Sequence, residues 1–538
     1  MRNRASIGTR LLACFWTTLA ATSTPAGSAH ADLFRTYQAQ EVQSRIRVQT
    51  GEVQHVKQVE ELITSAESLP IEFRADIQLT AIESGTLPNS KATEKTLERL
   101  FDSAGSVQVQ YKQKLVDPTA NTLARENFGV QTLNLDSLSI RVRIIKAMLS
   151  MDRIKAQREL EETRFQIPAA GCRSPLIPDV SEYYAQLQSL ASRVFPSDER
   201  GRGAQSFWVK DNIENLSSAV QLAPMAELLA EMEFGVGRFG DLLAAYMSVL
   251  QRLQATDREM AAIENEHTLS RAMRLLLTRT LNETFSAALL LSAYRTFLLR
   301  SAAAVPCGDV TANWNHVVQA FDQLRRDYDP DGAVGTIDLS GFMRPSGKGD
   351  HAEVEYLPDS STFDGLLRKV YALKQREAAW DGSNKQPDTQ GWETDLAAFL
   401  KQIDAYDPSK AECENCAYYD KAKLLLLFFD LAPAGSYKDK ILERLVSVLA
   451  QDPMQVNAPL LWAFQVKLLL NMSRETSKEQ ASQIERLQSK GQVLTMLPSA
   501  AGPKILASMK QSNNYVLYSY AVADELLQNQ FVSPPYLQ

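Results

Sequence analysis

Four aspartates close together form the group with the clearest chemical potential in this chain. Asp327, Asp329 and Asp331 alternate along the sequence, and Asp338 follows a little further on. Alternating carboxylates allow several oxygens to converge on one hard cation, and the adjacent Gly332 permits the sharp turn that such a loop requires. The spacing therefore predicts a Ca²⁺ site formed by Asp327, Asp329, Asp331 and Asp338.

The run from Asp327 to Asp338 resembles the calcium loop of EF-hand and dockerin-type proteins. The resemblance implies calcium binding in the weak range of extracellular modules, with a Kd of about 10⁻⁴–10⁻³ M. The match is incomplete, because the last ligand position carries Asp338 instead of the longer Glu, Pro330 stiffens the loop and Pro345 shortens the helix that would follow. The alternative is an acidic surface turn without a metal, since Asp-Pro-Asp-Gly is also favourable turn chemistry.

Other chemical motifs in the sequence lack the context that they need. Gly235 to Gly240 matches the letters of a dinucleotide-binding loop, but it follows an expected helix, Met225–Phe234, and not a strand. We therefore interpret it as a turn between two helices. The sequence has neither the Gly-x-Ser-x-Gly motif of a serine nucleophile nor a His-Glu-x-x-His zinc motif. We find no catalytic constellation and favour a protein that is not an enzyme.

The first 31 residues have the pattern of an export signal. An apolar run, Leu11–Ala21, follows Arg2, Arg4 and Arg10, and it is too short to anchor in a bilayer. A small-x-small sequence then predicts cleavage near Ala31, and a periplasmic or extracellular mature protein. Removing three arginines changes the net charge from −7 to −10. An acidic chain of this kind argues against nucleic acid and anionic membrane surfaces as partners. No later apolar run is long enough to span a membrane.

Four cysteines follow the expected signal, and an oxidising compartment predicts that they form disulfides. Three pairings are possible, and we favour Cys413–Cys416 together with Cys172–Cys307. Alternatively, Cys413 and Cys416 form a redox pair at the start of a helix, where thiolates are stabilised. No βαβ pattern supports a thioredoxin-like domain around them.

The elements that must position these residues are helices. Apolar residues recur every three or four positions in both halves of the chain, and 24 glycines and 22 prolines in 538 residues are fewer than average. We predict an all-α fold, a helical-hairpin array resembling a divergent α-solenoid. Two lobes, residues 32–305 and 361–538, would be joined by an irregular connector, residues 306–360, which carries the aspartate loop.

Helical segments can be placed from these periodicities, and two long segments are expected to be irregular. Residues 104–134 and 167–179 are the expected loops. The expected helices cover residues 42–66, 71–84, 88–101, 138–149, 152–165, 180–194, 281–305, 314–324, 361–373, 392–403, 417–430, 437–450, 460–471, 478–490 and 515–527. Further helices are expected between residues 194 and 281, with breaks at 196–203 and at Pro224.

Three short segments resemble uncharacterised exported helical proteins of bacteria: Ser68–Asp76, Leu138–Met151 and Cys416–Tyr419. The resemblance implies a helical, exported protein and no particular activity. We predict a non-enzymatic scaffold or binding protein that presents a concave helical surface to a protein or cell-envelope partner. One alternative is a glycoside hydrolase or polysaccharide lyase on an α/α toroid. Such a hydrolase requires two carboxylates about 5–10 Å apart in an aromatic cleft. A calcium-dependent adhesion or assembly module is the other alternative.

Overall fold

The computed structural model describes most of the chain after residue 52. The described residues are 53–87, 90–115, 131–163, 167, 176–235, 237–264, 267–304, 313–339, 363, 365–370, 372, 389–407, 417–431, 436–453, 459–489 and 501–527. Contacts divide the chain into residues 1–57 and 58–538, and the description below concerns the second unit. The predicted export signal and the four cysteines, Cys172, Cys307, Cys413 and Cys416, lie outside the described residues.

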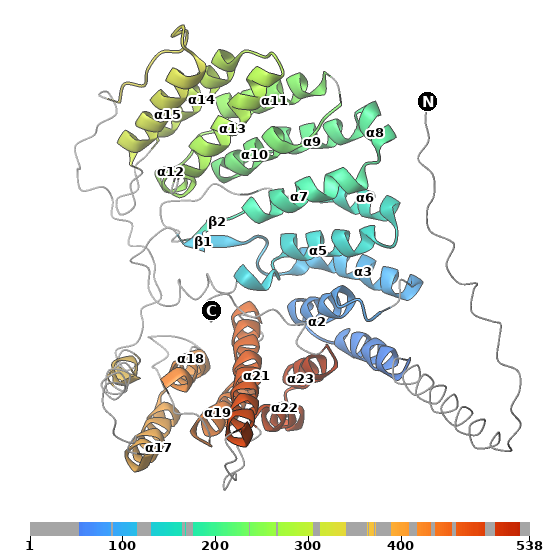
Figure 1. Cartoon of the computed structure of the whole chain (residues 1–538), viewed down its shortest axis with the longest axis vertical. Coiled ribbons are helices and arrows are strands. Elements are labelled where there is room, and N and C mark those ends of the chain that lie inside the picture. The colour runs from blue at the N-terminus through green and yellow to red at the C-terminus, as the bar shows by residue number, and fades with distance from the viewer. Residues whose placement is uncertain are drawn as a thin grey trace, which may run out of the picture. The chain divides into compact units, whose positions relative to one another are not determined.

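The fold is all-α, as the sequence predicts, with two short strands in the described part of the chain (Figure 1). The first helices are α2 (Ile71–Glu83), α3 (Lys91–Ser103), α5 (Ser137–Leu149), α6 (Arg153–Glu162), α7 (Ser181–Val194), α8 (Ser197–Arg202), α9 (Ala204–Glu214), α10 (Leu222–Glu231) and α11 (Arg238–Arg252). There follow α12 (Asp257–Glu264), α13 (Thr268–Asn282), α14 (Ala287–Ala302), α15 (Trp314–Tyr328), α17 (Thr389–Ala405), α18 (Ala417–Leu431), α19 (Ser436–Gln451), α21 (Pro459–Ser489), α22 (Ala501–Gln511) and α23 (Tyr515–Leu527). None of the described helices is long and apolar enough to cross a membrane.

Local capping chemistry sets several of these boundaries. The side chain of Ser90 accepts a hydrogen bond from the Thr93 N–H and begins α3, and Asp136 caps α5 in the same way. Asp152 caps α6. Such side chains satisfy amide groups that have no partner within the helix. Gly85 follows α2 with a φ of 72°, a left-handed conformation that ends a helix at little cost for glycine. The predicted glycine stop of this helix is therefore confirmed.

The predicted apolar stripe of α5 faces the core. Leu138, Val142 and Ile145 are buried, and Leu149 is half-buried at the end of the helix. The wholly apolar run in α18 is also a buried helix, with Leu424, Leu425 and Phe428 fully enclosed. Both predictions are confirmed.

The buried helix expected over residues 281–305 is α14, but it begins at Ala287, six residues later than predicted. The chain breaks between α13 and α14, where Thr284 adopts a φ of 61° and the Phe285 N–H donates to the Thr280 carbonyl. This 6→1 hydrogen bond is characteristic of the Schellman motif, which ends many helices. Leu281, near the end of α13, and Leu289, in the first turn of α14, are 49% and 63% exposed. Apolar composition alone could not reveal this break, because the residue that turns the chain is neither Gly nor Pro.

Other differences involve short or polar segments. The two helices expected at 460–471 and 478–490 are one helix, α21, because the residues between them include no Gly or Pro to interrupt it. Helix α22 was not predicted. Strands β1 (Gln113–Leu115) and β2 (Leu176–Pro178) lie in the two segments expected to be loops, and they pair antiparallel with Lys114 opposite Ile177. Strands of three residues are too short to give a recognisable period.

Helices from opposite ends of the sequence pack together. The Phe73 ring of α2 lies 5.2 Å from Trp462 of α21 and 6.3 Å from Tyr520 of α23, measured between ring centroids. All three side chains are fully buried, and edge-to-face contacts of this kind stabilise a core beyond the area that they bury. Buried apolar residues from Val59 to Leu527 form one hydrophobic cluster. The division into two lobes stays a prediction.

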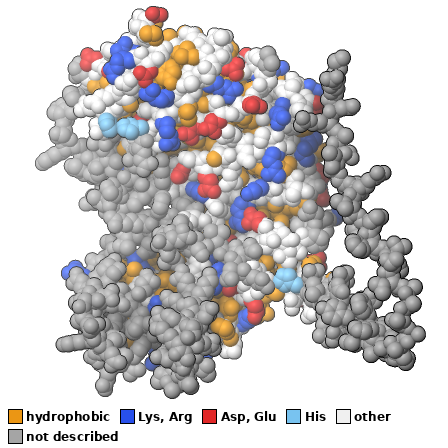
Figure 2. All heavy atoms as spheres, viewed as in Figure 1, with side chains coloured by type: hydrophobic (Ala, Val, Ile, Leu, Met, Phe, Trp, Pro, Cys, Tyr) orange, Lys and Arg blue, Asp and Glu red, His pale blue; other side chains and the backbone are white. Residues whose placement is uncertain are grey.

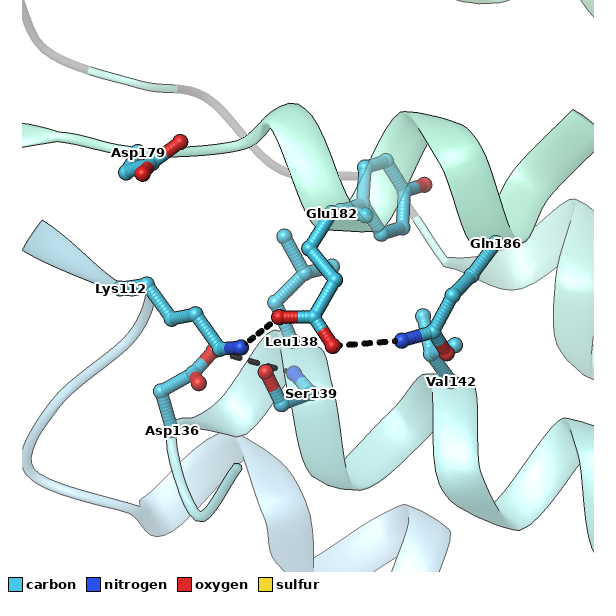
Figure 3. A pocket seen from close by; sticks show the side chains of 9 residues that line it. Lys112, Asp136, Leu138, Ser139, Val142, Asp179, Glu182 and Gln186 are labelled. Atoms are coloured by element: carbon cyan, nitrogen blue, oxygen red, sulfur yellow. Dashed lines mark hydrogen bonds and ion pairs between the residues drawn. The ribbon is translucent and has the colours of Figure 1, made fainter. Parts of the chain in front are cut away.

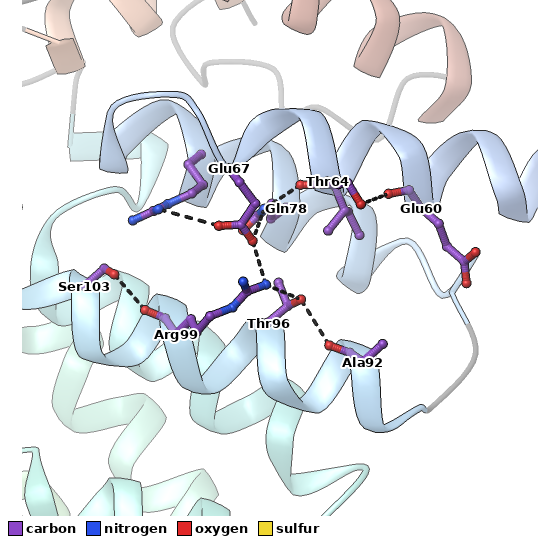
Figure 4. A network of polar contacts seen from close by, with 10 residues as sticks. Glu60, Thr64, Glu67, Gln78, Ala92, Thr96, Arg99 and Ser103 are labelled. Atoms are coloured by element: carbon purple, nitrogen blue, oxygen red, sulfur yellow. Dashed lines mark hydrogen bonds and ion pairs between the residues drawn. The ribbon is translucent and has the colours of Figure 1, made fainter.

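The opposite side of α2 is fixed by polar contacts. The Gln78 amide donates to the Ile63 carbonyl at 2.7 Å and to the Glu67 carboxylate at 3.3 Å (Figure 4). Glu67 also pairs with Arg99 of α3 at 2.7 Å. These bonds hold α2 between the helix that spans residues 53–66 and α3, and so fix the direction of its remaining side chains.

Candidate functional site

A cleft of about 930 Å³ lies among helices α2, α5, α7 and α21, which contribute to its walls. Its lining mixes charged groups, amides, hydroxyls and apolar side chains. The lining residues are Asp76, Thr80, Ile82, Glu83, Gly85, Leu87, Thr93, Thr132, Leu133, Asn134, Arg143, Lys146, Ala147, Ser150, Met151, Glu182, Gln186 and Lys467.

A buried ion pair joins α2 to α21 at this cleft. The Lys467 Nζ lies 2.8 Å from the Asp76 Oδ1, and the Tyr520 hydroxyl of α23 donates to the Asp76 Oδ2 at 2.7 Å. The side chains of Asp76 and Lys467 are only 1% and 5% exposed. Burial raises the pKa of Tyr520 well above its ordinary value, and the charge of Asp76 adds to the effect. Tyr520 therefore remains a neutral hydrogen-bond donor to the carboxylate.

A second ion pair lies on the wall formed by α2 and α5. The Arg143 Nε and Nη2 donate to the two oxygens of Glu83 at 2.8 and 2.7 Å, a bidentate arrangement. Burial alone would lower the pKa of Arg143, but the hydrogen bonds and charge of Glu83 outweigh it and the pKa is raised. Arg143 is thus a fixed cation in the cleft wall.

The third carboxylate of the cleft, Glu182 of α7, is paired with Lys112, next to β1, and accepts a hydrogen bond from Gln186 at 3.2 Å. Glu182 and Gln186 also line a water-sized cavity of about 10 Å³ (Figure 3). Asp136 lies at this smaller cavity, and burial raises its pKa although the Ser139 N–H donates to it. Each of the three carboxylates that line the large cleft therefore has a basic partner.

Strain is present in the cleft wall at Asn134. This residue has a φ of 55°, in the left-handed region that non-glycine residues enter at a cost of about 1 kcal/mol or more. It connects a buried turn containing Leu133 to the cap of α5. Backbone strain of this kind is frequent where a structure presents groups to a ligand.

Asp327 lies in the last turn of α15, Asp329 caps the C-terminus of this helix, and Asp331 and Asp338 follow it. The structure gives Asp327 and Asp329 other partners. Asp327 pairs with Arg274 of α13 at 2.7 Å, and the hydrogen bond from this guanidinium lowers the pKa of Asp327. Asp329 is buried, and its oxygens accept from the N–H groups of Ala333 and Val334 at 3.2 and 2.7 Å.

A backbone hydrogen bond also closes the turn that follows Asp329. Gly332 has the expected positive φ, 70°, and its N–H donates to the Asp329 carbonyl at 3.0 Å. Asp331 and Asp338 are exposed. Within the described residues, no group of three or more His, Cys, Asp or Glu side chains is placed to hold a metal ion. Calcium binding at Asp327, Asp329, Asp331 and Asp338 stays a prediction.

Two further motifs can be placed. Gly235 and Gly237 lie between α10 and α11, where Gly237 takes a φ of 77°, and Gly240 lies in the first turn of α11. The glycines therefore mark a turn between helices, as predicted. His267 and His316 lie at the starts of α13 and α15, with ring centroids 4.7 Å apart. No sequence pattern indicates that these two imidazoles meet.

The residues of the cleft were not identified from the sequence as functional. Lys467 and Asp76 are 391 positions apart, so no local pattern connects them. Two of the short segments named in the sequence analysis, Ser68–Asp76 and Leu138–Met151, contribute lining residues. The third ends at Tyr419, whose carbonyl accepts from Gln465 of α21, two positions before Lys467.

Comparison of the chain with protein-family models, curated proteins and solved structures finds no match. The surface of the described residues gives no simple electrostatic footprint either. Figure 2 shows acidic and basic side chains interspersed across the described part of this face, with scattered apolar groups between them. The cleft is therefore the candidate site among the described residues.

Proposed function

We propose that this protein is an exported, non-enzymatic binding protein whose ligand occupies the cleft formed by α2, α5, α7 and α21. The observation that carries the proposal is the size and lining of this cleft. A volume of about 930 Å³ lies within the range of ligand pockets, about 300–1,000 Å³. Its walls come from helices that are far apart in the sequence, and ion pairs hold their polar groups in place.

The paired carboxylates favour binding over acid–base catalysis at this position. A glycoside hydrolase requires one free acid and one free base beside an aromatic platform. Asp76, Glu83 and Glu182 each contact a basic side chain, and the described residues that line the cleft include no Phe, Tyr or Trp. The carbohydrate-active alternative and the calcium-dependent adhesion module stay predictions, without an observation at this cleft in their favour.

A blocked cleft tests the proposal. Ala147 lies on the cleft wall in α5, and Ala147→Trp would fill part of the space with an indole. Ala244→Trp, at an exposed position of α11, is the matched control. The melting temperature of each protein would be measured with a panel of peptides, oligosaccharides, fatty acids and nucleotides, since a ligand that binds the native state raises it.

We expect at least one compound of the panel to raise the melting temperature of the wild type and of the Ala244→Trp protein, but not of the Ala147→Trp protein. Equal shifts in all three proteins would place binding elsewhere and refute the proposal. Turnover of a panel compound that Ala147→Trp abolishes would refute the non-enzymatic part.

A further inference from the structure

The face that α5 turns to the cleft carries two cations at helical spacing. Arg143 and Lys146 are three positions apart, and Ala147 and Ser150 continue the same face. The buried stripe that begins at Leu138 lies on another side of this helix. The packing of α5 therefore places Arg143 and Lys146 on the same wall of the cleft.

The lining of the cleft includes three carboxylates and three cations, but these groups do not all pair with one another. Its three carboxylates are each paired: Asp76 with Lys467, Glu83 with Arg143, and Glu182 with Lys112. Lys146 is exposed and contacts no carboxylate among the residues that the structure describes. One positive charge at the cleft thus has no counterion within the described part of the protein.

Arg143 adds further donors beside this charge. Its Nε and Nη2 bind Glu83, which leaves the donors of Nη1 for another acceptor. A guanidinium and an ammonium three positions apart on one helix match the several oxygens of a carboxylate, phosphate or sulfonate. A cation, by contrast, would meet repulsion from Lys146 without a free carboxylate to offset it.

The remaining lining fits an apolar group attached to such an oxyanion. Ile82, Leu87, Leu133, Ala147 and Met151 also face the cleft. A ligand with a charged end and an apolar body would satisfy both parts of the wall, because burial of apolar surface adds to the attraction of the charge.

We propose that the ligand of this cleft is an amphiphilic anion, whose oxyanion binds Lys146 and Arg143 and whose apolar part packs against Leu133 and Met151. This inference rests on the proposed function, because it names the ligand class of the same cleft. It does not distinguish a carboxylate from a phosphate, so the experiment includes both.

The test uses two dyes and the full-length processed protein. The anionic probe is 8-anilinonaphthalene-1-sulfonate and the neutral probe is Nile red, each titrated by fluorescence. The variants are Lys146→Ala, Lys146→Glu and Lys146→Arg, with Lys401→Ala at an exposed position of α17 as the matched control. Ala147→Trp reports which part of each signal comes from the cleft.

We expect Lys146→Ala to weaken the cleft-dependent binding of the sulfonate dye by about three- to tenfold, and Lys146→Glu to weaken it further. Lys146→Arg and Lys401→Ala should bind as the wild type does, and Nile red should be insensitive to all four changes. Octanoate and octyl phosphate should displace the sulfonate dye from the cleft, and octanol should displace it much less. The more effective of the two anions identifies the preferred headgroup.

The outcomes separate this inference from the proposed function. Sulfonate binding that Ala147→Trp blocks but that every Lys146 variant retains would overturn the anion preference and leave the binding function intact. Displacement by octanol as strong as that by octanoate would overturn it as well. Dye binding that Ala147→Trp does not affect, for both probes, would overturn the two proposals together.

Discussion

Replacing Lys467 by Met removes the positive partner of a carboxylate that is almost completely enclosed. The Asp76 side chain is 1% exposed, and without the ammonium it would keep only the Tyr520 hydroxyl as a donor. Removing one member of a buried ion pair costs about 3–5 kcal/mol, because the remaining charge is left in a poorly polarisable environment. Both residues border the cleft, which can bring water to this edge. We therefore expect a loss of unfolding free energy near the lower limit, about 3 kcal/mol.

A double-mutant cycle isolates the contribution of the pair. Asp76→Asn removes the carboxylate that pairs with the buried Lys467 ammonium, whereas the combined Asp76→Asn and Lys467→Met protein contains neither charge of the pair. We expect the combined variant to be at least about 2 kcal/mol more stable than the sum of the two single losses predicts. The amide that replaces the carboxylate of Asp76 would still present an oxygen to the Tyr520 hydroxyl.

The measurement is urea unfolding followed by circular dichroism at a helix-sensitive wavelength. Lys510→Met is the matched control, since Lys510 forms an ion pair with Glu525 in which the side chains are 31% and 57% exposed. An exposed pair of this kind contributes about 0–1 kcal/mol. The reasoning would be refuted if Lys467→Met cost no more than the control, or if the losses in the cycle were simply additive.

Three further predictions concern single positions elsewhere. Burial raises the pKa of Glu159 from 4.5 to about 7, so its contribution to stability is fully present below about pH 4.5 and is lost as pH rises through 7. Glu159→Gln should remove this part of the pH dependence, and at pH 8 it should be more stable than the wild type by up to roughly 3 kcal/mol. Urea unfolding at pH 5 and pH 8 measures this difference. A pH dependence of stability that the substitution leaves unchanged would contradict the raised pKa of Glu159. In the loop after α15, Asp329→Ala should lower stability by about 1–3 kcal/mol because two amide donors lose their acceptor, whereas Asp331→Ala should have little effect. A calcium site would instead make both variants lose a calcium-dependent shift of the melting temperature, which a titration would reveal. Gly240→Ala should be destabilising, because an added Cβ would lie 2.6 Å from the Phe285 ring. In a Phe285→Ala background the same substitution should be neutral or stabilising, since alanine favours a helix over glycine. A double-mutant cycle measured by thermal unfolding tests this, and an equal effect in both backgrounds would contradict the clash.

The sequence could predict those features that depend on neighbours along one helix. The stripe of Leu138, Val142 and Ile145 identifies the buried side of α5, because side chains three or four positions apart share a face. Ser90 and Gly85 mark helix ends through chemistry confined to a few residues. The same local reasoning fails at Thr284, since its left-handed conformation depends on how α13 and α14 pack and not on the residue type alone.

The candidate site could not be predicted in the same way. Arg143 and Lys146 are ordinary surface residues on a helical wheel, and their role in one wall of a cleft depends on where α2, α7 and α21 lie. Conversely, the aspartates that match a metal-binding pattern in the sequence find nearer partners once folded, Asp327 through Arg274 and Asp329 through its own loop. Spacing along a chain limits which groups can converge, but it does not show which competing partner is closer.

The sequence by itself determined that this protein consists of amphipathic helices, because a repeat of apolar side chains every three or four residues is a property of the local backbone. Only the tertiary structure decided that Asp76 meets Lys467 and Tyr520, and that a cleft lined by Arg143 and Lys146 opens beside them. The physical reason is that ion pairing and cavity formation depend on distances in space, between groups that the chain separates by hundreds of residues.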